Sequence, residues 1–167
     1  VVDPFAGGSV RGIVAAATGR AYAGVDLRAE QIDANRIQWA ELGRPGLPAP
    51  RWVQGDALDV RQALPGLQAD LLFSCPPYGN LERYSDDKAD LSTMRYPRFL
   101  RTYRQIIKEA VAMLRQDRFA CFVVGDIRDT QGLYRGFVGD TIAAFRDAGA
   151  RLYNEAILVT QAGSLPI

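Results

Sequence analysis

Residues 1–27 read VVDPFAGGSVRGIVAAATGRAYAGVDL, and this stretch predicts the fold of the chain. A short apolar run at residues 1–4 leads into a glycine-rich turn. The helix expected at residues 9–18 ends at Gly19, and a second strand is expected at residues 21–27. A strand, a helix and another strand in this order form the repeating unit of a parallel sheet.

The rest of the chain continues this alternation. Further strands are expected at residues 51–57, 69–74, 119–124 and 152–160, and further helices at residues 29–42, 97–114 and 140–148. The fifth strand, FACFVV, lacks polar alternation, which is typical of a strand covered on both faces. The polar stretch 78–96 is a loop of a length that is usually functional or disordered. We therefore predict an α/β fold, a doubly wound, mostly parallel Rossmann-like sheet of about six strands with helices on both faces.

The composition limits the class of protein. The 167 residues fit one domain, and with 48% hydrophobic and 23% charged residues the chain can bury a full core. With a net charge of +1, any binding of nucleic acid would depend on a local basic patch. The absence of histidine excludes Ser-His-Asp and Cys-His catalysis and His-ligated metal sites, and two cysteines cannot form a four-cysteine zinc site. We predict a reduced, cytoplasmic protein without a membrane span or a metal.

The turn DPFAGGS at residues 3–9 lies where open α/β sheets bind ligands, at the carboxyl ends of the strands. Asp26 and Asp56 end the second and third strands, where one carboxylate can accept both hydroxyls of a ribose and the other can meet an adenine amino group. Asp3 places an anion beside the turn, which disfavours phosphates and favours an ammonium or sulfonium group. S-adenosylmethionine has both of these cations and no phosphate. Ser9, in the place of the middle glycine of G-x-G-x-x-G, also disfavours a dinucleotide, and a turn kept only for packing is the remaining alternative.

A second candidate site, SCPPY at residues 74–78, follows the fourth strand. Each proline holds the residue before it in an extended conformation, so that Pro76 can present a rigid carbonyl to an exocyclic amino group. Two acceptors on such an amine would localise its lone pair for attack on a methyl donor, without a tuned base. Tyr78 can stack on an extruded base. The structural alternative is a tight turn with a buried aromatic ring.

Together, the two motifs resemble those of the S-adenosylmethionine-dependent DNA amino-methyltransferases, which form N6-methyladenine or N4-methylcytosine. The cofactor motif of that family, D-P-F-x-G-S-G, compares with DPFAGGS, and its catalytic motif, (D/N/S)-P-P-(Y/F/W), compares with CPPY. The cofactor motif comes first, which resembles the gamma-type order. The resemblance implies S-adenosylmethionine as cofactor and DNA as partner. It implies catalytic roles for Cys75, Pro76, Pro77 and Tyr78, and cofactor contacts from Asp3, Pro4, Phe5, Ala6, Gly7, Gly8, Asp26, Leu27, Asp56 and Ala57.

The chain departs from the family pattern at two places. Gly8-Ser9 reverses the usual Ser-Gly, which is a small change because both residues are small. Cys75 stands where Asp, Asn or Ser is usual, and a thiol is a weak acceptor. Ser74 cannot easily replace it, because neighbouring residues of a strand point to opposite faces. In the resembled family, serine at this position favours cytosine N4 as the target. Cysteine is nearest in size to serine, so cytosine N4 is the favoured target here, and adenine N6 stays open.

Basic and polar residues that follow the proline pair are candidates for binding nucleic acid. The loop and one face of the long helix supply Asn80, Arg83, Tyr84, Arg101, Arg104 and Lys108. A solvated outer helix face is equally compatible with the basic residues. Asp126, at the end of the fifth strand, can either line the base pocket or cap the next turn.

We expect residues 1–167 to form a single catalytic domain without a separate target-recognition domain, since only residues 79–96 separate the proline pair from the long helix. The seventh strand and the further cofactor motif of the family are not recognised, so a fragment that lacks the last strand is expected. Three alternatives stay open: a methyltransferase of RNA bases or protein glutamine, a non-catalytic remnant that binds nucleic acid, and a dinucleotide oxidoreductase.

Overall fold

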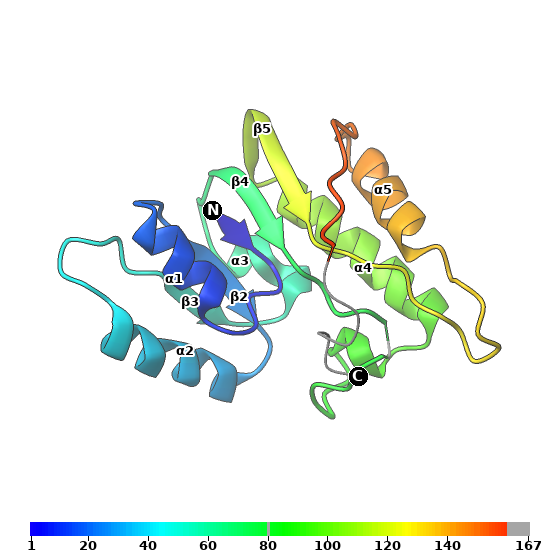
Figure 1. The fold of residues 1–167 in the computed structure, drawn as a ribbon, viewed down its shortest axis with the longest axis horizontal. Helices are drawn as coiled ribbons and strands as arrows, with labels where there is room; N and C mark the ends of the chain where they lie inside the picture. The colour runs from blue at the N-terminus through cyan, green and yellow to red at the C-terminus, as the bar shows by residue number, and fades with distance from the viewer. Residues whose placement is uncertain (80, 160–167) are drawn as a thin grey trace.

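In the described part of the chain, five parallel strands form one sheet, in the order β3-β2-β1-β4-β5 (Figure 1). The computed structural model describes residues 1–79 and 81–159. The strands are β1 (Val2–Asp3), β2 (Ala23–Asp26), β3 (Arg51–Gln54), β4 (Ala69–Ser74) and β5 (Leu114–Phe122). The helices are α1 (Val10–Ala17), α2 (Ala29–Leu42), α3 (Val60–Ala63), α4 (Tyr96–Val111) and α5 (Phe137–Asp147), with short 3-10 helices η1 (Ala57–Asp59) and η2 (Leu91–Thr93).

The two faces of the sheet carry different helices. Tyr22 and Trp52 pack with residues of α1 and α2 in one buried cluster. The alternate strand residues Ala23 and Val25 belong to a second cluster, together with residues of α3 and α4. Since successive strand residues point to opposite faces, the sheet is covered on both sides, as the sequence predicts. The strand order reverses direction between β1 and β4, which is where ligands bind in folds of this class.

The strand β5 differs from the expectation that both of its faces are covered. Phe119 is 57% and Val123 is 42% exposed, and Cys121 is also exposed, whereas Ala120 and Phe122 pack against the buried clusters. The buried cluster that includes residues of α1 and α2 contains Tyr22, which directly precedes β2, and Trp52 of β3, but no residue of β5. An apolar run without alternation was therefore not sufficient evidence that helices cover both faces.

The prediction of a sixth strand at residues 152–160 is wrong for residues 152–159, the part that the structure describes. Residues 152–159 form no regular structure, and Ile157, Leu158 and Val159 are 89%, 80% and 85% exposed; Thr160 lies outside the described residues. β-Branched and aliphatic residues favour extended backbone, but a strand also needs a neighbour that pairs with its N–H and C=O groups. The sheet ends at β5, and no described strand pairs with this segment. Within the described residues, no helix is both long and apolar enough to span a bilayer.

Candidate functional site

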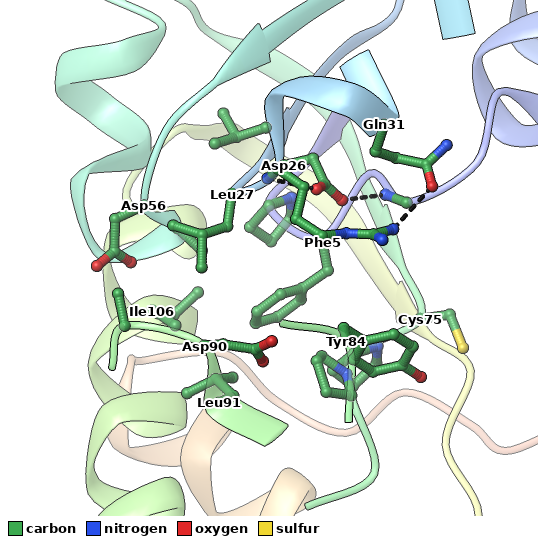
Figure 2. Close-up of a pocket in the computed structure, with 18 of the residues that line it drawn as sticks. Phe5, Asp26, Leu27, Gln31, Asp56, Cys75, Tyr84, Asp90, Leu91 and Ile106 are labelled. Carbon is green, nitrogen blue, oxygen red and sulfur yellow. Dashed lines mark hydrogen bonds between the residues drawn. The ribbon is translucent and has the colours of Figure 1, made fainter. Parts of the chain in front are cut away.

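The carboxyl ends of the strands surround a cavity of about 310 Å³ (Figure 2). The glycine loop, residues 3–9, and the proline loop, residues 74–78, both contribute to its surface. Most of the residues predicted to bind the cofactor or to act in catalysis line it: Pro4, Phe5, Gly7, Gly8, Asp26, Leu27, Asp56, Ala57, Cys75, Pro76, Pro77 and Tyr78. The sequence did not single out Arg11, Val25, Arg28, Gln31, Ala89, Asp90, Leu91 and Ile106, which also line it.

Asp26 fixes the glycine loop against the end of β2. Its Oδ2 accepts a hydrogen bond from the N–H of Gly7 at 2.9 Å, and its Oδ1 accepts one from the N–H of Arg28 at 2.9 Å (Figure 2). Gly7 has a φ of 50°, in the left-handed region that favours glycine. Because an ionised carboxylate has further lone pairs, Asp26 can still accept hydrogen bonds from a ligand in the cavity.

A row of polar side chains on α2 holds the same loop from the other side. Asn35, which is 1% exposed, donates from Nδ2 to the carbonyl oxygen of Gly7 at 2.7 Å. Its Oδ1 accepts from Gln31 Nε2 at 3.0 Å, and Gln31 Oε1 accepts from Arg28 Nη2 at 2.9 Å. Gln38 accepts from the hydroxyl of Ser9. Gln31, Asn35 and Gln38 lie at i, i+4 and i+7, a spacing that would have indicated a polar helix face directed at the loop.

Asp3 does not line the cavity, which corrects the expectation that its charge faces a ligand. It is fully buried and accepts hydrogen bonds from Arg11 Nε at 2.6 Å and from the hydroxyl of Tyr22 at 2.8 Å. The hydroxyl of Ser74, 71 residues away in the chain, and the N–H of Phe5 donate to the same carboxylate. Burial, with a further contribution from Asp3, raises the pKa of Tyr22 far above its ordinary value, so its phenol stays a donor. Asp3, at the end of β1, thus connects the end of β4, the start of α1 and the residue before β2.

Ala6 is the second predicted contact residue that does not line the cavity. It is fully buried, and its N–H donates to the carbonyl oxygen of Val25 at 2.9 Å. Its small side chain packs beside Gly24, where a Cβ would lie 2.8 Å from that of Ala6 and 2.6 Å from the hydroxyl of Tyr22. The two small residues therefore allow the close approach of the loop to β2, which is a structural role.

In the proline loop, the two residues before the proline pair point in different directions. Ser74 is fully buried and bonded to Asp3, whereas Cys75 lines the cavity, which confirms that Ser74 cannot take the place of Cys75. The Sγ atom of Cys75 lies 3.6 Å from the hydroxyl of Tyr78, which donates to the carbonyl oxygen of Val123 at 3.2 Å. Either group can be the donor in the contact between the thiol and the phenol, and in both cases a sulfur lone pair remains available to a ligand.

Burial, followed by the contact with Cys75, raises the pKa of Tyr78 well above its ordinary value. The phenol therefore stays neutral at physiological pH. Its ring packs edge-on against Phe137 of α5, with ring centroids 6.2 Å apart. Tyr78 is thus held by contacts at its hydroxyl and at its ring.

The segment 84–92 forms another part of the cavity lining. Asp90, 7% exposed, accepts hydrogen bonds from the N–H of Ser92 at 2.8 Å and from the hydroxyl of Ser85 at 2.8 Å. The N–H of Tyr84 donates to Ser92 Oγ at 3.1 Å. The predicted loop therefore contains an ordered turn at η2, and the sequence D-L-S, with a capping Asp before the turn, was the signal for it.

The other residues expected to bind nucleic acid lie away from the cavity or outside the described residues. Arg83, Arg101, Arg104 and Lys108 do not line the cavity, and Asn80 lies outside the described residues. Arg104 pairs with Asp147 at 3.1 Å and with Asp140 at 3.8 Å, which connects α4 to α5. Arg83 pairs with Asp86 at 2.6 Å.

Asp126 is a capping residue. Its Oδ1 accepts hydrogen bonds from the N–H groups of Gly136 and Phe137, both at 3.0 Å, at the first turn of α5. It does not line the cavity. Of the two roles that the sequence left open for Asp126, the structure shows the cap.

No group of three or more His, Cys, Asp or Glu side chains among the described residues could hold a metal ion. Comparison of the chain with protein-family models and with curated proteins finds no match. The geometry and chemistry of the cavity are therefore the basis on which a function can be inferred.

Proposed function

We propose that the chain is the catalytic domain of an S-adenosylmethionine-dependent DNA methyltransferase that acts on the exocyclic amino group of cytosine or adenine. The observation that supports this proposal best is that the glycine loop and the proline loop line one cavity of about 310 Å³. This volume is within the range of small-molecule sites. A methyl donor held by one loop would lie next to a base held by the other.

The cavity lining suits a cationic nucleoside. Asp26 would accept hydrogen bonds from the ribose hydroxyls, and Asp56 would accept one from the adenine amino group. Phe5, Leu27 and Ile106 provide apolar surface for the adenine ring. Of the described residues that line the cavity, Asp26, Asp56 and Asp90 are acidic and two are arginines, one of which already pairs with Asp3. This balance of charge at the cavity, to which the buried Asp3 does not contribute, favours a sulfonium over a phosphate.

The chemistry requires that the target amine be positioned and its lone pair localised. S-adenosylmethionine, when bound, supplies an electrophilic methyl group. The carbonyl of Pro76 and the sulfur of Cys75 would accept hydrogen bonds from the two amine hydrogens, which directs the nitrogen lone pair toward the donor. Tyr78, held neutral by its raised pKa, would contact the base through its ring and transfers no proton. The amine loses its proton to solvent after attack, so no histidine is needed.

The test is methyl transfer from labelled S-adenosylmethionine to duplex and single-stranded DNA, followed by nucleoside analysis. Label in N4-methylcytosine or N6-methyladenine would support the proposal and identify the base. A variant with Pro76 and Pro77 both replaced by alanine should lose transfer but keep cofactor binding. Label found only in RNA or in protein would contradict the proposal and favour one of the alternative methyltransferases.

A further inference from the structure

Arg11 is near the start of α1, and its side chain reaches back to the glycine loop, as expected because helical side chains tilt toward the N-terminus. Its Nε donates to Asp3 at 2.6 Å, and its Nη2 donates to the carbonyl oxygens of Phe5 and Ala6. No described residue accepts a hydrogen bond from Nη1, and Nη1 is not one of the buried polar atoms that lack a partner. The side chain of Arg11 is 23% exposed, so within the described part of the chain the N–H groups of Nη1 are left for a ligand.

A ligand in the cavity can reach Arg11 but not its partner. The side chain of Arg11 is 23% exposed and lines the cavity, whereas Asp3 is fully buried and does not. Cys75 of the proline loop lines the same cavity. Burial alone would lower the pKa of Arg11, but the charge and hydrogen bond of Asp3 raise it, and Tyr22 and Cys75 add to this effect. The guanidinium thus remains charged between the two loops.

Arg11 and Asp26 both lie close to Gly7. Asp26 accepts from the N–H of Gly7 at 2.9 Å, and a Cβ built on Gly7 would lie 3.9 Å from Arg11 Nη2. A nucleoside whose ribose binds Asp26 would therefore extend its 5′ substituent across Gly7 toward Arg11. The substituent of S-adenosylmethionine ends in an amino-acid group, and a planar guanidinium with open N–H groups is well suited to a carboxylate.

We infer that Nη1 of Arg11 binds the carboxylate of the amino-acid group of the cofactor and so selects ligands that carry this group. The inference rests on the proposed function, because it assumes a nucleoside at Asp26. It makes Arg11 a binding residue as well as the partner of Asp3. The usual motif of the resembled family, quoted above, does not include this position.

The experiment is calorimetric titration of the full chain with two ligands, S-adenosylmethionine and decarboxylated S-adenosylmethionine, which keeps the sulfonium and the amine. The decarboxylated ligand should bind roughly 10- to 100-fold more weakly, as expected when hydrogen bonds to a charged group are lost. In Arg11→Met, S-adenosylmethionine should bind more weakly by the same factor, whereas the affinity of the decarboxylated ligand should stay unchanged. Arg20→Met, which replaces an exposed arginine beyond the end of α1, is the matched control and should change neither value.

The comparison of the two ligands on the unaltered chain is decisive even where Arg11→Met fails to fold because Asp3 has lost its partner. Equal affinity for the two ligands would overturn the inference and leave the proposed function in place. A preference that persists undiminished in Arg11→Met would overturn it as well, since another residue would then bind the carboxylate. If neither ligand binds the unaltered chain, the proposed function fails, and the inference fails with it.

Discussion

The glycine loop and the segment 84–92 line the same cavity, but they are held in different ways. Side chains from other elements bind the glycine loop: Arg11 of α1, Asp26 of β2 and Asn35 of α2. The hydrogen bonds that hold the segment 84–92 lie within it, from Tyr84 to Ser92 and from Ser85 to Asp90, and span only eight and five residues of sequence, while Leu91 packs in the buried cluster with α4 and α5. The polar contacts of one part of the cavity are thus tertiary, and those of the other part are local.

This difference predicts a difference in stability within the molecule. Contacts between sheet and helices are lost only when those elements separate, whereas a segment held by its own hydrogen bonds can open while the rest stays folded. The glycine loop should therefore be nearly as stable as the sheet. The segment 84–92 should open at a lower free energy, which would suit a site that keeps a cofactor surface fixed and admits a large second substrate.

The largest expected effect is on the buried cluster at Asp3. Asp3→Asn keeps the shape of the side chain but leaves the partly buried guanidinium of Arg11 without its counterion. Loss of one partner of a buried ion pair costs about 3–5 kcal/mol, so the free energy of unfolding in urea should fall by that order. Asp70→Asn is the control, because Asp70 also pairs with arginines, Arg115 and Arg118, but at the surface.

Asp70→Asn should leave the free energy of unfolding nearly unchanged, because exposed ion pairs contribute little. Comparable losses in the two variants would mean that the cluster at Asp3 is no more important to the fold than a surface ion pair. The glycine loop would then not owe its stability to that cluster, and the contrast with the segment 84–92 would be weakened.

The next effect concerns binding. Asp26→Ala should weaken the binding of S-adenosylmethionine by about 1.5–3 kcal/mol, which is the contribution of hydrogen bonds to a charged group. It also removes the acceptor of the Gly7 N–H, so the loss includes any displacement of the loop. Calorimetry measures the change, with Asp33→Ala on the exposed side of α2 as control. Unchanged affinity in Asp26→Ala would contradict the ribose contact.

The sequence predicted the architecture because its helices end at recognisable residues and its strands alternate with them. The helix expected at residues 29–42 is found at these bounds, and Gly43 follows it. The prediction of a strand at residues 152–160 was wrong because a strand forms only beside a partner strand. The preferences of single residues contain no information about that partner. The order of the strands, and thus the edge of the sheet, is a property of the whole chain.

In the candidate site, the sequence could not separate acids that look alike. Asp3 and Asp26 both end a strand, but only Asp26 lines the cavity, because Arg11, Tyr22 and Ser74 enclose Asp3. These partners come from α1, the segment before β2 and the end of β4, so no local pattern indicates them. The ends of neighbouring parallel strands meet at one edge, and this alone predicted that the two loops would be close.

A smaller effect distinguishes the two ways of holding the cavity. Asn35→Leu keeps the size of the residue but leaves the carbonyl of Gly7 without its donor, at a cost of about 1–3 kcal/mol of stability. Ser85→Ala removes a local hydrogen bond to Asp90 and should cost about 0.5–1.5 kcal/mol. Hydrogen exchange should rise at Gly7 in the first variant, and only within residues 84–92 in the second. Faster hydrogen exchange throughout the sheet in Ser85→Ala would contradict the local character of the hydrogen bonds in the segment 84–92.

Cys75→Ser is expected to have the smallest effect on stability. It is also the most direct test of the proline loop. Cys75 is half-buried, and its polar contact is a 3.6 Å approach to Tyr78, so the free energy of unfolding should change little. A hydroxyl is a stronger acceptor than a thiol, so the rate of methyl transfer should stay the same or rise if the sulfur only accepts a hydrogen bond from the target amine. Cys121→Ser, on the exposed face of β5, is the matched control and should not alter the rate. If Cys75→Ser abolished transfer while Cys121→Ser remained active, the sulfur would have to take part in the reaction itself, because a lost hydrogen-bond acceptor cannot account for inactivity when the serine hydroxyl supplies a better one.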